Sequence, residues 1–575
     1  MAAINHRDNN LSEKTSLLNE TMQSKSGEYN LPTAETIEMK DTSPNKDVTI
    51  AEHGLLYRID ENPPWYYGMF LGFQHYMTMF GSTVAVPFIL AGSLCIKDNH
   101  LVLSEIISTI FFVSGLATLI QTTIGNRLPI VQGATFSFLG PTIAILSLEK
   151  FKCSPATLIV TNSTANTTVT IEHDWKKGML EVQGAIAVAS IFQVLIGFTG
   201  AVGFLLRFIG PLTVAPTVSL VGLALFNAAG DFAGHQWGIA GLTVLLIILF
   251  SQVLYKIKVF RMFPVLFAIG ISWAVSAIIT AAGGFDDDSL ARTDRRLDVL
   301  KKAEWIRFPY PGQWGTPTVS VASVFGMLAG VLASMLESLG DYFACARLSG
   351  APAPPNHAVN RGIGLEGFSC ILAGLWGSGN GTTSYSENIA AIGITRVGSR
   401  RVIQFGAVFM ILLSILGKFG AVFTLIPDPI VGGMFWTLFG LIVAVGLSNL
   451  QFVNLNSSRN LFVLGFAFFT GMVIPAWLGK NPTAINTDND EVNQILNVLL
   501  QTNMAVGGVT AAILDNALPG SLEDRGITKW RKIQSSEEDE IPQASIHVYD
   551  LPFIQAYLNK TSWAKYVPFL PYHGT

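Results

Sequence analysis

The amino-acid sequence predicts an all-α polytopic membrane protein with about fourteen transmembrane segments, arranged as a 7+7 inverted repeat. Half of the residues (50%) are hydrophobic and only 13% are charged, and the mean hydropathy is +0.44. A soluble domain has about 25% charged residues. Most of this chain is therefore suited to lipid.

Nearly uncharged runs follow one another from residue 67, each close to the roughly 20 residues that span the hydrocarbon core. The long runs are 67–94, 102–123, 128–148, 184–206, 208–230, 236–255, 262–284, 317–340, 402–424, 429–447, 460–479 and 494–514. Two shorter pieces, 361–378 and 382–396, are separated by a glycine-rich stretch. An even count places both termini on one side, and basic residues in the short loops, such as Arg400 and Arg401, indicate the cytoplasm.

The loop 149–183 then lies outside the cell. It carries glycosylation sequons at Asn162 and Asn166, whose modification requires this exposure. Cys95 and Cys153 fall on the same side, where a disulfide and two free thiols are both open alternatives.

Two of the predicted segments are broken. The third contains Gln132 to Phe138 followed by Gly140 and Pro141, and the tenth contains Gly379 to Glu387. Each starts extended and polar and then becomes apolar, as expected for a half-helix whose amino-terminal N–H groups face a ligand. Seven is an odd number, so two sets of seven segments enter the membrane with opposite orientations, and such repeats place a binding site at the midplane.

Two acids at membrane depth, Glu337 and Glu387, need a functional reason, because a charge in lipid is costly. We interpret them as binding a polar solute, together with Asn388 and its neighbours Tyr385 and Ser386. Carboxylates accept hydrogen bonds from ring N–H groups, and amides or hydroxyls donate to carbonyls. Phe136, in the first break, offers a face for stacking a flat ring. The alternative for Glu337 is a structural pair with a base.

A coupling ion is also expected. Asp341 and Ser384, with backbone carbonyls, offer oxygen ligands for sodium, whereas a proton would require titration of Glu337 or His75. Structural roles are the alternatives for His75, and an ordinary helix-end acid is the alternative for Asp341.

Three motifs together resemble the nucleobase/ascorbate transporter family, from about residue 64 to 520. They are Gln74-His75, Glu337-Ser338-Leu339-Gly340-Asp341, and the signature that runs from Glu387-Asn388 to Thr395-Arg396. Ala390 departs from the signature, which has Gly there. Three further stretches, at 347–352, 397–401 and 446–450, resemble the vertebrate sodium-coupled branch.

The resemblance implies an elevator-type, alternating-access carrier in the plasma membrane, with a homodimer and a sodium ion as expected partners. It also implies a core domain that moves substrate against a gate domain. The expected divisions are a disordered cytoplasmic tail (1–60), core (64–206), gate with an extracellular loop (207–316), core (317–424), gate (425–518) and a cytoplasmic tail (519–575).

The resemblance also bears on the substrate. Ascorbate carriers of this family have Pro where this chain has Glu387, and a carboxylate there would repel the ascorbate anion. The expected cargo is therefore uracil-like pyrimidines and purines such as guanine and hypoxanthine, with sodium-dependent ascorbate transport as the alternative. A channel or receptor is a hypothesis of another class. We expect neither enzyme activity nor a cofactor, other than sodium as coupling ion, and no nucleic-acid partner.

Overall fold

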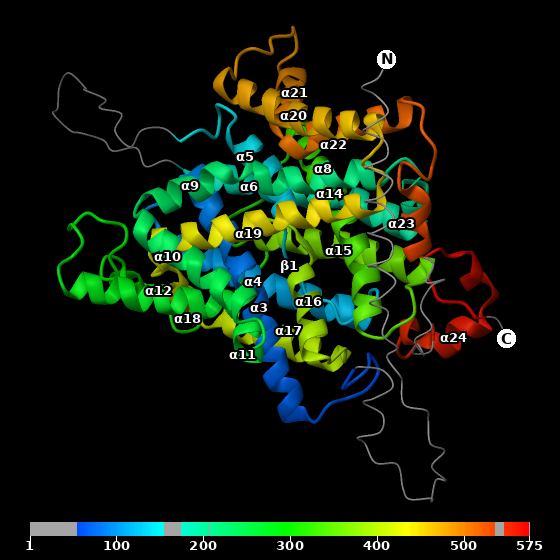
Figure 1. Ribbon diagram of the computed structural model, residues 1–575, viewed down its shortest axis with the longest axis horizontal. Coiled ribbons are helices and arrows are strands. Elements are labelled where there is room, and N and C mark those ends of the chain that lie inside the picture. Colours follow the sequence, from blue (N-terminus) through cyan, green and yellow to red (C-terminus); the bar gives the residue numbers. More distant parts are fainter. Residues whose placement is uncertain (1–54, 154–173, 206, 535–545, 574–575) are drawn as a thin grey trace, which may run out of the picture. The chain divides into compact units, whose positions relative to one another are not determined.

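Helices make up most of the structure, a computed structural model that describes residues 55–153, 174–205, 207–534 and 546–573 (Figure 1). Within these ranges, eight helices are long and apolar enough to cross a membrane, and one bent pair would make a ninth. The prediction of a polytopic membrane protein is thereby confirmed. The fourteen-segment, 7+7 arrangement stays a prediction, because several of the predicted segments are short or broken helices.

The first part of the chain begins with two long helices and continues through a broken segment into a series of further helices. Its elements are α3 (Trp65–Ser93), α4 (His100–Thr123), β1 (Gln132–Ala134), the 3₁₀ turn η1 (Phe136–Phe138), α5 (Leu139–Leu146), α6 (Trp175–Thr199), α7 (Val202–Leu205), α8 (Pro211–Ala224), α9 (Phe226–Gly234), α10 (Trp237–Ile248), the π-helix η2 (Leu249–Val253), α11 (Lys258–Met262) and α12 (Pro264–Ala281).

The second part repeats the theme of a long helix, a strand and a half-helix, and ends in short helical turns. Its elements are α13 (Leu297–Lys302), α14 (Val321–Leu348), α15 (Asn356–Trp376), β2 (Thr382–Ser384), α16 (Ser386–Thr395), α17 (Arg400–Ile415), α18 (Gly417–Thr424), α19 (Asp428–Ser448), η3 (Asn449–Phe452), α20 (Ser458–Lys480), α21 (Asp490–Gln501), α22 (Asn503–Ala517), α23 (Ile527–Gln534), η4 (Ile546–Tyr549), α24 (Gln555–Lys560) and η5 (Ser562–Tyr566).

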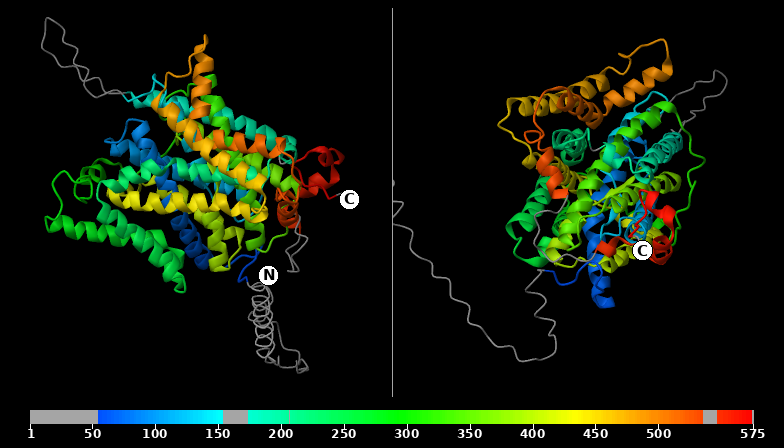
Figure 2. Two further views of the ribbon diagram at one scale, coloured as in Figure 1. Left: turned by 45° about the horizontal axis from the view of Figure 1, so that its top comes forward. Right: turned by 90° about the vertical axis from the view of Figure 1, so that its right-hand side faces the viewer.

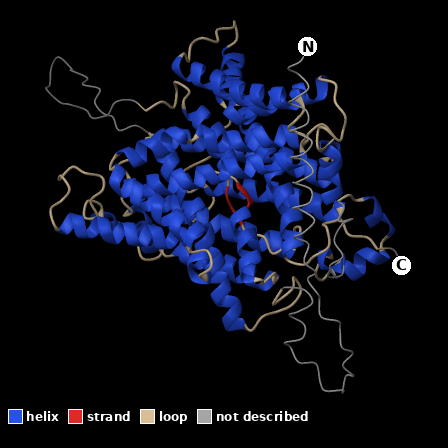
Figure 3. Cartoon of the chain, in the orientation of Figure 1, coloured by secondary structure: helices blue, strands red, loops and turns tan. Residues whose placement is uncertain are grey.

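The two predicted breaks each contain a strand, and the two strands pair with each other inside the helical bundle (Figure 3). β1 runs antiparallel to β2, with Gln132 opposite Ser384, Gly133 opposite Thr383 and Ala134 opposite Thr382. The pairing supplies hydrogen-bond partners for the backbone N–H and C=O groups of the two breaks, which have no partners within a helix. Such partners are necessary where water is scarce. The strands lead into the half-helices α5 and α16, so both half-helices begin at the same crossing.

Two glycines allow the chains to approach closely at this crossing. A Cβ on Gly133 would lie 2.5 Å from Cζ of the Tyr385 ring, and a Cβ on Gly381 would lie 2.8 Å from the Phe138 ring. Each glycine therefore leaves room for an aromatic ring supplied by the opposite broken segment.

Helices from residues 64–206 pack extensively against helices from residues 317–424. α6 runs along α15, and α17 packs on α3 and α4. Small residues bring these backbones together, since a Cβ on Gly197 would lie 2.3 Å from the backbone N of Gly364, and one on Gly72 would lie 2.8 Å from that of Gly406. Such contacts are typical of helix packing in membranes.

A second group of helices is formed by α8, α9, α10, α19, α20 and α22. α19 packs against α8, α9 and α10, while α22 packs against α20 and α8. A Cβ on Gly432 of α19 would lie 2.2 Å from the backbone N of Ala233 in α9. The two groups meet where α14 contacts α8 and α22 and where α3 contacts α19, and α21 also packs on α14.

The predicted span 494–514 is wrong as a single straight helix. The structure divides this region into α21 and α22, which meet at Thr502 with a bend of 83°. Thr502 has φ −91° and ψ 103°, an extended conformation that ends α21. The apolar run indicated a span, but α21 carries Asn493, Gln494 and Asn497 and is strongly amphipathic, which favours a position with one polar side.

The loop between α12 and α13 and the carboxyl-terminal segment lie at opposite ends of the bundle (Figure 1, Figure 2). Cys95 and Cys153 form a disulfide. Cys345 and Cys370 are buried free thiols. Asn162, Asn166 and nearly all of the predicted amino-terminal tail 1–60 lie outside the described residues.

Candidate functional site

Polar side chains gather around the crossing of the two broken segments, between α3 and α14. Glu387 lies in the first turn of α16, and its Oε1 accepts a hydrogen bond of 2.8 Å from the hydroxyl of Ser82 on α3. Glu337 lies on α14, and its Oε2 accepts a bond of 3.3 Å from the hydroxyl of Ser137 in η1. Both carboxyl residues are partly exposed rather than sealed in the core.

A glycine on α14 allows Ser137 to come close enough to hydrogen-bond Glu337. A Cβ on Gly330 would lie 2.9 Å from the carbonyl oxygen of Ser137. Because no side chain stands there, η1 approaches α14 closely, and the hydroxyl of Ser137 reaches Glu337 seven residues further along the same helix.

Asp341 and Ser386, which were assigned to different functions, are direct partners. The hydroxyl of Ser386 donates to Oδ1 of Asp341 at 2.7 Å. The other oxygen, Oδ2, is buried and has no hydrogen-bond partner among the described residues. One lone-pair face of this carboxylate is therefore available to a ligand.

Asn388 faces His75 of α3. Its Nδ2 donates to the backbone oxygen of His75 at 2.8 Å and lies 3.2 Å from the ring Nδ1. Asn388 is fully buried and His75 nearly so. The pair fastens the start of α16 to α3, next to the contact that joins Ser82 and Glu387.

The side chain of Tyr385 makes its contacts at the crossing of the two strands. Its hydroxyl donates to the carbonyl of Ala134 at 2.7 Å and lies 3.1 Å from the hydroxyl of Thr83, while its ring covers Gly133. The hydroxyl thus joins the two broken segments to α3. Phe136 is partly exposed, and its ring meets Phe439 of α19 edge to face, with centroids 5.9 Å apart.

Ser384 belongs to a network around Glu366, a buried acid of α15 that sequence reasoning missed. Oε2 of Glu366 accepts hydrogen bonds from Ser338 (2.6 Å), Tyr342 (3.3 Å) and Ser384 (3.4 Å), and Oε1 accepts from Gln193 (3.1 Å). The signal was present, because Glu366 is an acid within the apolar piece 361–378 and the cost of a charge in lipid applies to it equally.

Four carboxyl groups therefore interact electrostatically within the site: Glu337, Asp341, Glu366 and Glu387. None of them belongs to any ion pair found among the described residues. Lys418, a basic residue of α18 that lies within the predicted span 402–424, contacts backbone carbonyls of Leu300 and Lys301. The alternative of a structural base paired with Glu337 finds no support in the described chain, and the cluster requires protons or a bound cation to offset its charge.

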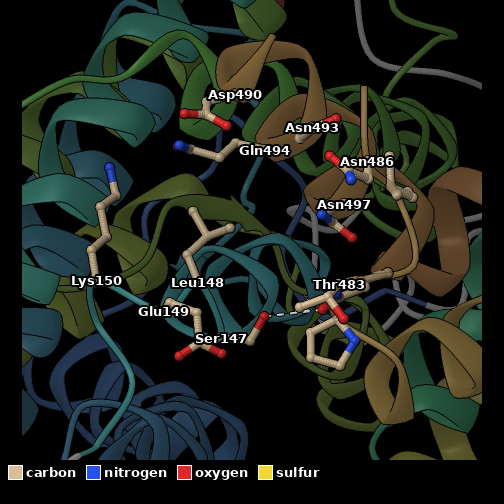
Figure 4. A pocket seen from close by; sticks show the side chains of 13 residues that line it. Ser147, Leu148, Glu149, Lys150, Thr483, Asn486, Asp490, Asn493, Gln494 and Asn497 are labelled. Carbon is tan, nitrogen blue, oxygen red and sulfur yellow. Dashed lines mark hydrogen bonds between the residues drawn. The ribbon is translucent and has the colours of Figure 1, made fainter. Parts of the chain in front are cut away.

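A separate cavity of about 580 Å³, lined mostly by polar residues, lies between the end of α5, the chain that joins α20 to α21, and α21 itself (Figure 4). Glu149, Asn486, Asn493 and Asn497 are among its lining residues, and Ser147 donates to Oε1 of Gln501 at 3.0 Å. None of the four site carboxylates lines it.

A helical membrane bundle with two crossed, broken segments and an interior cluster of polar groups defines a membrane transport protein. The comparisons agree with this class: the Xan_ur_permease family, described as a permease family, matches residues 68–480. The chain belongs to this family, whose members are transporters and not enzymes.

Its relatives include rat Solute carrier family 23 member 1, which is 51% identical over 541 residues covering 90% of this chain and 89% of that protein. Rat Solute carrier family 23 member 2 is 50% identical, with coverage of 90% and 82%. Nucleobase-ascorbate transporter 1 of Arabidopsis thaliana is 38% identical, with coverage of 87% and 96%.

Among solved structures, murine Solute Carrier 26 family member A9, an anion transporter in the inward-facing state, matches with a TM-score of 0.50 and 12% identity. The match covers 81% of this chain and 73% of that one. This likeness concerns the fold alone.

Proposed function

We propose that the protein is a sodium-coupled nucleobase transporter that carries uracil-like pyrimidines and purines across the plasma membrane. The observation that carries the proposal is the placement of Glu387 and Glu337 on facing elements. Among the described residues, each carboxylate has a single hydroxyl partner and neither is paired with a basic side chain. Two such carboxylates suit a ligand with several N–H groups.

The chemistry of a nucleobase matches the remaining groups of the site. Ring N–H groups would donate to the two carboxylates, and a ring carbonyl would accept from backbone N–H groups at the start of α16. No side chain caps that helix end. The Phe136 ring, which is partly exposed, supplies an apolar contact for the flat base.

Sodium is the proposed coupling ion. The free oxygen Oδ2 of Asp341 is a carboxylate ligand of the right type, and the hydroxyls of Ser386 and Ser384 lie on the same broken segment. Sodium prefers such oxygen ligands at broken helices. A cation there would also offset the negative charge of the four neighbouring acids. Binding of sodium would therefore favour binding of the nucleobase, and the reverse.

An elevator-type movement is proposed for the transport step. The helices of 64–206 and 317–424 would move together with the substrate, because they pack through close glycine contacts, while the helices around α19 would form the gate. The ring contact between Phe136 and Phe439 spans these two groups. Both termini would be cytoplasmic, and a homodimer would form through the gate.

Uptake into cells expressing the full chain tests the proposal. Radiolabelled uracil, guanine and ascorbate are each supplied with sodium and with sodium replaced by choline, and surface expression is measured in parallel. We expect saturable, sodium-dependent uptake of the bases and none of ascorbate. Ascorbate uptake without base uptake would overturn the role given to Glu387 and favour the second candidate, sodium-dependent ascorbate transport.

A further inference from the structure

The carboxyl-terminal segment brings two histidines and an aspartate together outside the candidate transport site. Nδ1 of His547 lies 2.8 Å from Oδ2 of Asp550, and Nε2 of His573 lies 2.6 Å from Oδ1 of the same carboxylate. We propose that these three side chains bind one divalent transition-metal ion of the Zn²⁺ type. The inference is independent of the substrate that the protein transports.

The local backbone explains how the three side chains converge. Asp550 directly follows the 3₁₀ turn η4, and its backbone N–H donates to the carbonyl oxygen of His547 at 3.0 Å. This bond continues the 3₁₀ pattern, in which residues three apart lie on the same face, so His547 and Asp550 project together. His573 returns from 23 residues further along the chain. One ligand atom from each residue lies within 4.8 Å of the others. Zn²⁺ bonds of about 2.0–2.2 Å place tetrahedral ligand atoms roughly 3.3 Å apart, so shifts on the order of 1 Å would complete the site.

The ligand set selects the kind of metal. Two imidazoles and one carboxylate match Zn²⁺, Co²⁺ and Ni²⁺, whereas Ca²⁺ and Mg²⁺ require oxygen ligands throughout. The side chains are 64% (His547), 16% (Asp550) and 25% (His573) exposed, which leaves a path for the ion and a place for water as a fourth ligand. Arg127 and Arg361 interact electrostatically with Asp550 and oppose the cation, so the neutral imidazoles must supply much of the affinity.

The segment is held in place by the helical bundle, which reduces the entropy cost of assembling the ligands. Arg361 of α15 donates to the carbonyls of Tyr549 (2.7 Å) and Phe569 (3.3 Å), and Arg400 of α17 donates to that of Val548 (3.0 Å). Leu551, Leu558 and Ala564 form a small apolar core within the same segment. A bound metal would therefore close a loop that is anchored to α15, the helix that carries Glu366.

Metal titration of the full chain in detergent tests the site. The protein carries a tag without histidines and is first stripped with chelator. Co²⁺ is then added while its visible absorption is recorded, and Zn²⁺ is added to compete. We expect one Co²⁺ per chain, displaced by Zn²⁺, and affinity weakened at least about tenfold in His573→Asn and in Asp550→Asn. His235→Asn is the matched control, because His235 also lies beside an aspartate, Asp428, at 3.9 Å but outside this cluster.

Equal Co²⁺ binding by the wild type and both cluster variants, or no binding by the wild type, would overturn the proposal and leave a hydrogen-bonded His-Asp-His cluster. X-ray absorption of the Zn²⁺-loaded wild type provides a second measurement that does not depend on variant folding. Scattering from two imidazoles supports the site, and scattering without imidazole contradicts it.

Discussion

The two broken segments share a backbone design but divide the chemistry of the site between them. The first, from Gln132 to Leu146, has no charged residue, whereas the second places Glu387 in the first turn of its half-helix. The hydroxyl of Thr135 caps the first by accepting from the backbone N–H of Ser137, whereas no side chain in the described part of the protein caps α16. We therefore expect the second segment to present its amino-terminal N–H groups and its carboxylate to a ligand, and the first segment to position the second.

The largest effect should come from removing the charge of the second segment. Glu387→Gln replaces charge-assisted hydrogen bonds to a nucleobase by neutral ones, each weaker by about 1–1.5 kcal/mol. For two such bonds, KM should rise roughly 30- to 150-fold. Uracil uptake by surface-expressed protein measures this change. Glu181→Gln is the control, because Glu181 also accepts hydrogen bonds from hydroxyls, those of Thr318 and Ser323, away from the crossing. If KM for uracil is unchanged in Glu387→Gln, other groups and not Glu387 bind the nucleobase.

The next effect concerns the positioning role of the first segment. Gly133→Ala would place a methyl group 2.5 Å from the Tyr385 ring, and such overpacking costs about 1–3 kcal/mol. We expect a lower apparent Tm in detergent and less protein at the cell surface. Gly140→Ala is the control in the same segment, because there the new Cβ would have enough space: it would lie 3.6 Å from the nearest atom, a methyl of Thr502. Equal stability of the two variants would contradict the tight crossing.

Removing the hydroxyl partners one at a time sharpens the division of roles. Ser82→Ala removes the 2.8 Å bond to Glu387, and Ser137→Ala removes the 3.3 Å bond to Glu337. We expect KM for uracil to rise several-fold in both variants, because an unpartnered charged acceptor costs about 1–3 kcal/mol before water replaces the hydroxyl. The rise should be larger in Ser82→Ala, because the hydrogen bond that it removes is the shorter one. A larger effect at Ser137 would assign the stronger binding role to Glu337.

Sequence alone predicted the membrane class and where the extended pieces break two segments, because apolar runs and glycines are local signals. It also selected Glu337 and Glu387, since the cost of a charge in lipid can be judged from position. The partners of these acids could not be predicted. Ser82 and Ser137 are separated from them by 305 and 200 residues, and only the packing of α3 and η1 brings them near.

Two of the predicted binding residues, Asn388 and Tyr385, also have distant partners that the sequence could not reveal. Asn388 follows Glu387 directly, but adjacent residues on a helix point about 100° apart, so Asn388 turns to His75. Tyr385 precedes the helix and is held by the carbonyl of Ala134 on the opposite strand. The bend at Thr502 was missed because hydrophobicity reports whether a run can enter lipid, and not whether its helix is straight.

The smallest effect tests whether the first segment also contacts the second group of helices. Aromatic pairs arranged edge to face contribute about 0.5–1.5 kcal/mol beyond burial in double-mutant cycles. The decreases in apparent Tm of Phe136→Leu and Phe439→Leu should therefore sum to more than the decrease in the double variant. Phe136→Leu combined with Phe462→Leu is the control, because Phe462 stacks on Phe466 within α20 and distant sites are additive. If the decreases in Tm of Phe136→Leu and Phe439→Leu are additive, the two rings are not energetically coupled. The first segment would then position Glu337 without a stabilising contact to α19.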